Sequence, residues 1–212
     1  MRRFFRELRF DLKEPGINIR MIPLAAGLFL IMTYIVQSNL EQNNLITLSL
    51  LETLIPFLGG YGAMMLMQGL LDTEGGELNF TYPRSYLYWG LIRQLRFFIL
   101  FAVLIAVVCG AVSVMMDIAF GQLFLLTLAQ SFAVMAVSFL GVTSGKKVSI
   151  GLIVLIGFIG IQITLGREYA LFNWIFVMSG AMPYPEQLTS ITLNALGIGV
   201  FGWGVGQVLI RP

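Results

Sequence analysis

The sequence predicts an all-α, polytopic membrane protein, and three observations support this prediction. Apolar residue types make up 58% of the 212 residues and charged types make up 11%, against about 45–50% and about 25% in soluble globular domains. The mean hydropathy is +0.86. Long apolar runs recur along the chain, and a helix needs ~20 such residues to cross a ~30 Å hydrocarbon core. We therefore expect a single transmembrane domain over residues 1–212.

Residues 1–20 are expected to form an amphipathic helix in the headgroup layer. They do not resemble a cleavable signal peptide, because no Ala-x-Ala-like site follows a short apolar core. Helical spacing gathers apolar side chains on one face and basic side chains on the other, with Phe10 as the exception, and Pro15-Gly16 ends the element. A plain basic anchor with no further role is the alternative. The apolar face is Phe4, Phe5, Leu8 and Leu12, and the basic face is Arg2, Arg6, Arg9 and Lys13.

Six membrane spans are expected after this helix, each long enough to cross the hydrocarbon core. Polar or charged stretches separate the first three, a break at Asp117 and Gly121 separates the third from the fourth, and a tight turn at Lys146-Lys147 separates the fourth from the fifth. The predicted spans are Met21–Gln37, Leu45–Leu71, Gln94–Met116, Gln122–Thr143, Val148–Leu165 and Leu188–Ile210.

The basic residues predict the orientation, because loops on the cytoplasmic side carry an excess of Lys and Arg. With both termini in the cytoplasm, twelve of the 13 basic residues lie on the inner side, and only Arg167 lies outside. The opposite topology would reverse this distribution. We therefore expect a plasma-membrane protein of bacterial type with both termini inside. The twelve are Arg2, Arg3, Arg6, Arg9, Lys13, Arg20, Arg84, Arg93, Arg96, Lys146, Lys147 and Arg211.

The rare residue types argue against an enzyme. The chain has no His and a single Cys, Cys109, so His-ligated metals, His general bases and thiolate clusters are not available. Cys109 lies in an apolar run and is interpreted as a small core residue. No phosphate-binding loop of the form G-x-x-x-x-G-K-[ST] is present. We expect no cofactor on this chain.

An acidic segment is expected on the cytoplasmic side between the second and third spans, over residues 72–93. Asp72, Glu74 and Glu77 fall within six residues, where short inner loops normally carry Lys and Arg. A short helix that starts near Glu77 and stops before Pro83 would present an acidic first turn to a partner. A solvated connecting loop is the alternative.

The run Asp-x-Glu-Gly-Gly-Glu-Leu-x-x-x-Tyr-Pro-Arg-Ser in this segment resembles the cytoplasmic signature of type-2 ABC transporter permeases. In that family, Glu-x-Gly-Thr-Leu-Glu-x-x-x-Ser-x-Pro follows the second span. Aligned on Pro83, Glu77 matches the second Glu, and Tyr82-Pro83 takes the place of the final residue-Pro pair. Gly75-Gly76 departs from the usual Thr-Leu. The whole chain is similar in layout, with a basic N-terminal helix, six spans and a longer outer segment before the last.

This resemblance implies a coupling helix that docks on a separate ATPase subunit, with residues 1–20 as the elbow that braces it. ATP and Mg²⁺ would bind that partner. The assembly would hold two ATPases and a second permease, identical or homologous, in the lipid bilayer, and no nucleic acid. The coupling residues implied on this chain are Asp72, Glu74, Glu77, Tyr82, Pro83 and Arg84.

A second candidate site lies in the long second span. Glu52 is ionisable within a span, which by default indicates function. It could line a pathway or gate, or it could be hydrated near the outer headgroups. Pro56, Gly59 and Gly60 in the same span are interpreted as a hinge or a site of close packing.

Residues 166–187 are too apolar for a free loop and too interrupted for a span. We expect them to lie at the outer interface or to re-enter it, with Tyr169, Trp174 and Tyr184 as belt residues. A belt without a gating role is the alternative. In the last span, Gly202 and Gly206 have the small-xxx-small spacing that allows helices to approach closely.

Taken with the resemblance, these features predict the permease subunit of an ATP-driven exporter that works by alternating access. A lining nearly free of charge favours an amphipathic or hydrophobic cargo, such as an antimicrobial or toxin peptide, a drug or a lipid. The alternative is a scaffold, sensor or immunity subunit that binds an ATPase without transport.

Overall fold

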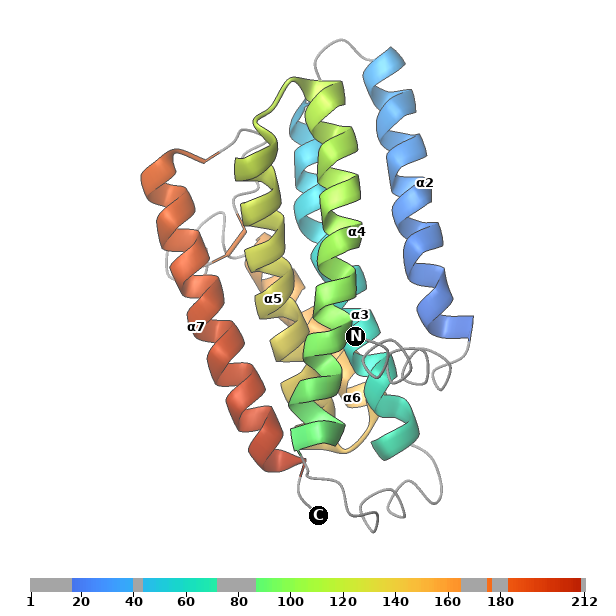
Figure 1. Ribbon diagram of the computed structural model, residues 1–212, viewed down its shortest axis with the longest axis vertical. Coiled ribbons are helices and arrows are strands. Elements are labelled where there is room, and N and C mark those ends of the chain that lie inside the picture. Colours follow the sequence, from blue (N-terminus) through green and yellow to red (C-terminus); the bar gives the residue numbers. More distant parts are fainter. Residues whose placement is uncertain (1–16, 40–43, 72–86, 165–174, 177–182, 211–212) are drawn as a thin grey trace, which may run out of the picture.

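The computed structural model describes residues 17–39, 44–71, 87–164, 175–176 and 183–210. Within these ranges, every regular element is a helix, which confirms the all-α prediction (Figure 1). Residues 1–16 of the expected elbow lie outside the described ranges, and Ile17 to Arg20 belong to the first described helix instead. The helices are α2 (Ile17–Asn39), α3 (Asn44–Leu71), η2 (Tyr88–Ile92), α4 (Arg93–Met116), α5 (Phe120–Gly145), α6 (Val148–Thr164) and α7 (Pro185–Leu209).

Two short turns define the two ends of the bundle. Asp117 ends α4 with φ 51°, and Lys146 ends α5 with φ 54°. Both residues take the left-handed conformation that commonly closes a helix, so the chain reverses within a few residues, as the sequence breaks at these positions predict. We refer to the two ends of the bundle as the Asp117 end and the Lys146 end.

Helices α3, α4, α6 and α7 pack around α5, and α7 runs parallel to it (Figure 1). Three glycines of α7 allow this contact. A Cβ on Gly199 would meet the ring of Phe132, one on Gly202 would lie 3.1 Å from the backbone of Ala136, and one on Gly206 would lie 2.7 Å from the ring of Phe139. The Gly202/Gly206 spacing is therefore a packing motif, and its partner is α5.

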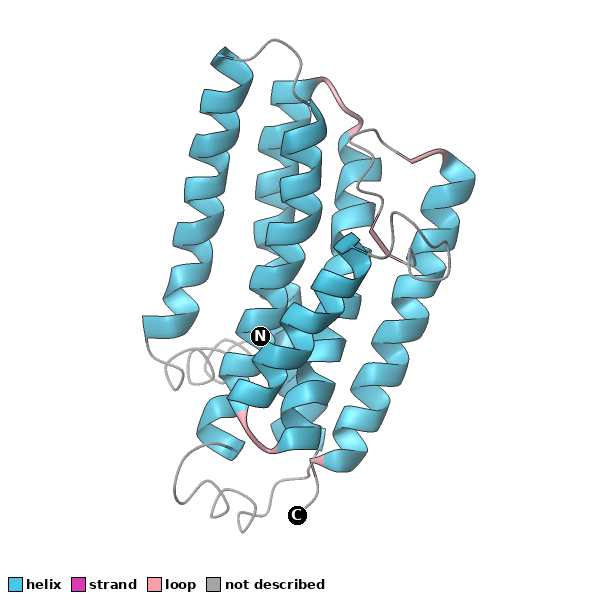
Figure 2. Cartoon of the chain, turned by 180° about the vertical axis from the view of Figure 1, so that it is seen from behind, coloured by secondary structure: helices cyan, strands magenta, loops and turns pink. Residues whose placement is uncertain are grey.

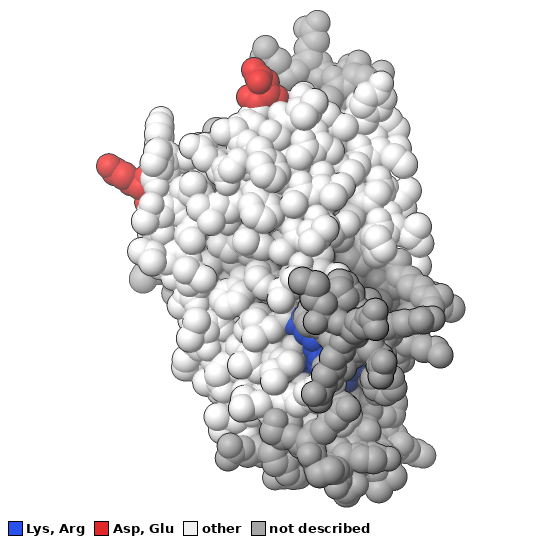
Figure 3. All heavy atoms as spheres, in the orientation of Figure 1, with Lys and Arg blue, Asp and Glu red and all other residues white. Residues whose placement is uncertain are grey.

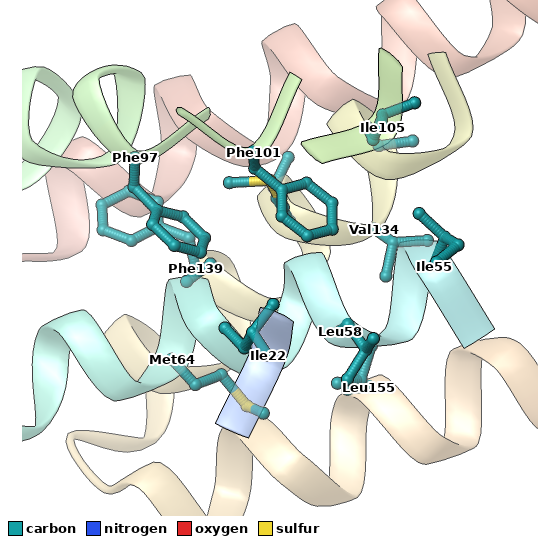
Figure 4. Close-up of a cluster of buried hydrophobic side chains, with 14 of the residues drawn as sticks. Ile22, Ile55, Leu58, Met64, Phe97, Phe101, Ile105, Val134, Phe139 and Leu155 are labelled. Atoms are coloured by element: carbon teal, nitrogen blue, oxygen red, sulfur yellow. The ribbon is translucent and has the colours of Figure 1, made fainter. Parts of the chain in front are cut away.

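The hydrophobic core lies between α3, α4, α5 and α6, and Figure 4 shows side chains of these helices converging on it. Phe97 and Phe101 of α4 stack with ring centroids 5.9 Å apart. Helix α2 lies at the edge: Ile22, Ala26 and Phe29 are buried on one of its faces, whereas much of its remaining surface is exposed and apolar. Apolar surface of this kind is expected of a helix that faces lipid.

Four helical segments of the described chain are long and apolar enough to cross a membrane: Ile46–Gln68, Tyr88–Met116, Phe120–Gly145 and Pro185–Leu209. Two shorter apolar helices, Met21–Val36 and Val148–Thr164, accompany them. The third predicted span thus begins earlier than expected, at Tyr88, and the sixth begins at Pro185.

The described charges are separated along the bundle axis. In Figure 3 the acidic atoms in view lie towards the Asp117 end, the basic atoms in view lie in the opposite half, and the visible described surface between them is uncharged. An uncharged belt is what a hydrocarbon environment requires. Among the residues whose side chains are described, the basic ones are Arg93, Arg96, Lys146 and Lys147, and the acidic ones are Glu52, Asp117 and Glu186.

Candidate functional site

The predicted coupling residues, Asp72, Glu74, Glu77, Tyr82, Pro83 and Arg84, lie outside the described residues. Their flanks are described: α3 stops at Leu71, and the chain is helical again from Leu87, with both points at the Lys146 end. The connecting segment is therefore shorter than the expected 72–93. Residues Tyr88 to Ile92, which were expected in this segment, are helical instead. They are largely apolar, and Trp89 is only 8% exposed, because burial removes such side chains from water.

The first turn of this helix is a π-turn that is held by α7. The side chain of Gln207 accepts a hydrogen bond from the backbone N–H of Leu91, with 2.7 Å between Oε1 and N. Gly90 lets the carboxamide approach, since a Cβ at this position would clash with Gln207 Oε1. π-turns shift the backbone hydrogen-bond ladder and frequently occur at functional sites. Here the shifted ladder is stabilised by a side chain from the last helix.

Two arginines follow this π-turn, and both are buried in the bundle. Arg93 is 1% exposed and Arg96 is 4% exposed, although the sequence placed them with the inner loop. The Arg96 guanidinium carbon lies 4.9 Å from the ring centroid of Tyr88, within cation–π range. Between the two arginines, Gln94 Nε2 donates to the carbonyl of Ala63 at 2.8 Å and links α4 to α3. The base of α4 is therefore a polar contact region inside the protein.

The second predicted site, in α3, is buried as well. Glu52 is 6% exposed, which does not agree with a hydrated position at the headgroups. Pro56 is also buried. A Cβ on Gly59 would lie 2.7 Å from the ring of Phe101, and one on Gly60 would lie 2.6 Å from Ser138 Oγ. The two glycines thus serve close packing of α3 on α4 and α5, one of the two predicted roles.

Known proteins do not identify this chain. Comparisons with family models, with curated proteins and with solved structures find no match.

One buried polar contact between distant segments was not predicted from the sequence. Gln130 of α5 is fully buried, and its Nε2 donates to the carbonyl of Ile175 at 2.7 Å. Ile175 and Phe176 are non-helical and at most 1% exposed, and in Figure 2 this piece lies among the helices, below the turn that joins α4 to α5. Part of the expected outer segment thus enters the bundle. A strongly polar Gln within an apolar span was the available signal.

Other predicted residues of the outer segment are only partly described. Tyr184 is 76% exposed and precedes α7, consistent with a belt position, whereas Tyr169 and Trp174 lie outside the described residues. Cys109 is buried, with Sγ 3.6 Å from Thr127 Oγ1, and is a packing residue. In the described part of the chain, no group of three or more His, Cys, Asp or Glu is placed to hold a metal ion.

Proposed function

We propose that this chain is the six-span permease subunit of a type-2 ABC exporter, with both termini in the cytoplasm of a bacterial cell. Four helices are long and apolar enough to cross a membrane, and two shorter apolar helices would complete the proposed six. The described basic residues gather at the Lys146 end, and the positive-inside rule makes this the cytoplasmic end. The uncharged surface between the two ends fits the hydrocarbon core.

The connection between α3 and α4 is the observation that carries this proposal. Residues 72–86 join Leu71 to Leu87 at the basic end of the bundle, and they contain Glu77 and Pro83 of the permease-like signature. An acidic, permease-like segment at the cytoplasmic face is suited to docking on an ATPase. This chain would supply the membrane path, while ATP and Mg²⁺ would bind the partner.

The proposed cycle uses two permeases, identical or homologous, and two ATPases. Closure of the ATPases on ATP would push residues 72–86, and the push would reach the membrane through the turn at Tyr88–Ile92. The Gln207 contact with this turn would pass the movement on to α7. The cargo would be amphipathic or hydrophobic, because the described spans carry few charges.

The ATPase contact can be tested by affinity purification of the full chain from its native membranes, with mass spectrometry of the recovered proteins. We expect an ATPase subunit to be recovered, and the double variant Glu74→Ala with Glu77→Ala to lose it at equal membrane levels. A desolvated interfacial charge pair is worth ~2–5 kcal/mol, and a rim pair is worth less than ~1 kcal/mol.

Glu186→Ala is the matched control, because Glu186 is an exposed acid at the opposite end of the bundle. It should leave ATPase recovery unchanged. Full recovery with the double variant would remove residues 72–86 from the contact. Stimulation of ATPase turnover by cargo then separates a transporter from a scaffold, sensor or immunity subunit, which would bind the ATPase without stimulation.

A further inference from the structure

Three helices of the core meet at Gly60, and this contact sets their relative register. A Cβ on Gly60 would lie 2.6 Å from Ser138 Oγ of α5, 3.0 Å from Val134 of α5 and 2.9 Å from Leu155 of α6. Farther towards the Lys146 end, a Cβ on Gly151 of α6 would meet both Val142 of α5 and Met64 of α3. Gly60 lies opposite Ser138, and Met64 lies opposite Val142, so residue numbers rise in the same direction along α3 and α5, which are parallel. On α6, Leu155 lies at Gly60 and Gly151 at Met64, so α6 is antiparallel to both.

This register brings buried polar residues of three helices to one level. Glu52 lies eight residues before Gly60 on α3. Gln130 and Ser131 lie eight and seven residues before Ser138 on α5. Both distances are about 11–12 Å along the helix towards the Asp117 end. Gln162 lies seven residues beyond Leu155 on α6, at the same level. Each of the four is at most 6% exposed. We call Glu52, Gln130, Ser131 and Gln162 the polar layer.

The polar layer also receives non-helical backbone, since Gln130 Nε2 binds the carbonyl of Ile175. Gln130 is ten residues into α5, about 15 Å from the Asp117 end, which is near the middle of a ~30 Å hydrocarbon core. At this depth, irregular backbone is tolerated only where it is buried in protein or lines a cavity. In transporters, such interruptions near the midplane accompany binding sites.

Two side-chain oxygens in this layer have no hydrogen-bond partner. Gln130 Oε1 and Ser131 Oγ are buried, and neither makes a hydrogen bond in the described structure. Other hydroxyls of α5 bond to their own helix: Thr127 donates to the carbonyl of Leu123 and Ser138 to that of Val134. Ser131 does not. A buried polar group without a partner is destabilising, so a ligand that donated hydrogen bonds to these oxygens would bind favourably.

The chemistry of the layer selects the kind of ligand. The oxygens of the Gln130 amide and the Ser131 hydroxyl can accept hydrogen bonds from a donor, and the Glu52 carboxyl group lies at the same level. We propose that the polar layer binds an N–H donor group, an amine or an amide, on the molecule that the chain carries. This inference rests on the proposed transport function and places a cargo site within one subunit, between α3, α5 and α6.

Thiol labelling of the full chain in membranes tests this site without an identified cargo or ATPase. In a Cys109→Ala background, Ser131→Cys puts a thiol in the polar layer with almost no change of shape. The probes are two methanethiosulfonate reagents with the same reactive head, one carrying an aminoethyl group and one a sulfonatoethyl group. Each rate is divided by the rate of the same reagent at Ala119→Cys, which is exposed in the turn between α4 and α5.

We expect the normalised rate of the aminoethyl reagent at Ser131→Cys to exceed that of the sulfonatoethyl reagent by about tenfold, the factor for one hydrogen bond to a charged donor. Adding Glu52→Gln should reduce this preference several-fold. Val134→Cys is the matched control, because Val134 is equally buried on α5, one turn from Gln130, and packs on Gly60. It should not react. Gln162→Cys, in the same layer on α6, is a second reporter if Ser131→Cys folds poorly.

Three outcomes would overturn the proposal. Absence of reaction at both reporters would show a dry, closed core. Equal rates of the two reagents would show a water-filled opening without donor preference, and reaction at Val134→Cys would show general loosening of the bundle. Because labelling needs no ATPase, failure of the ATPase contact and failure of this site give separate results.

Discussion

At the residue scale, the glycines of α7 divide into two groups by what surrounds them. Gly199, Gly202 and Gly206 are buried against α5, whereas a Cβ on Gly197 or Gly204 would meet no atom within 4 Å. The first group lets two helices approach closely, which is how small residues strengthen helix packing in membranes, where lipid removes most of the hydrophobic driving force. Residues of one type in one helix therefore differ in structural role.

This difference predicts unequal effects of the same substitution at neighbouring positions. Gly206→Leu places a side chain against Phe139, whose ring atoms lie 2.7 and 2.8 Å from the new Cβ, and should cost about 1–3 kcal/mol through overpacking. Gly204→Leu should leave stability equal or slightly higher, since Leu favours helix over Gly by ~0.8 kcal/mol. Thermal unfolding of both variants in detergent measures the difference, and equal melting temperatures would contradict the α5–α7 packing.

At the scale of elements, the π-turn at Tyr88–Ile92 joins three parts of the protein. It opens α4, follows residues 72–86, and binds Gln207 of α7 across 116 positions of sequence. Close by at the same end, Lys146 Nζ donates to the carbonyl of Leu209 at 2.8 Å and fixes the last turn of α7 to the turn between α5 and α6. Movement at the base of α4 therefore has a direct route to α7.

The role of Gln207 can be isolated by a pair of variants. Gln207→Leu removes the acceptor of the Leu91 N–H and should cost about 1–3 kcal/mol locally, as expected for a backbone donor left without a partner. Gln207→Glu retains an acceptor oxygen at the same position. Hydrogen–deuterium exchange of a peptide over residues 87–93 should be faster in Gln207→Leu and near wild type in Gln207→Glu. If exchange is unchanged in both, Gln207 does not hold this turn.

At the scale of the whole molecule, the separation of charge has a physical consequence. The described basic residues lie at the Lys146 end, Asp117 and Glu186 lie at the other end, and Glu52 lies in that half. A bundle of this kind is inserted with its basic end in the cytoplasm, because translocating Lys and Arg across the membrane is disfavoured. We therefore expect the proposed ATPase contact and the Lys146 turn on the same side.

Single-cysteine labelling of intact cells measures this orientation. In a Cys109→Ala background, Asp117→Cys should react with an impermeant thiol reagent, and Lys147→Cys should react only after the membrane is opened. Lys147 is the better position to replace, since it is exposed, whereas Lys146 has a left-handed backbone and holds Leu209. Labelling of Lys147→Cys in unopened cells would reverse the topology and with it the proposed function.

The sequence alone was sufficient for the helical class and for the turns at Asp117 and Lys146. It also predicted five of the six helices that follow the N-terminal segment to within four residues at each end. These features depend on local composition: apolar runs favour helices in lipid, and short polar breaks end them. The start of the third helix was missed by six residues, because Tyr88 to Ile92 were assigned to the charged segment. The hydropathy of such a short apolar run does not show whether the run belongs to the helix that follows it or to the loop that precedes it.

Only the tertiary structure decided which polar residues meet. Arg93, Arg96 and Glu52 were expected near water or left open, yet all three are buried. Gln130 binds Ile175 from 45 positions away, and Gln207 binds the turn before α4. Each contact depends on the relative rotation and register of helices, which packing at Gly60, Gly202 and Gly206 establishes. Hydropathy sums residues along one segment and carries no information on that register, so the polar layer emerges only when the helices are packed together.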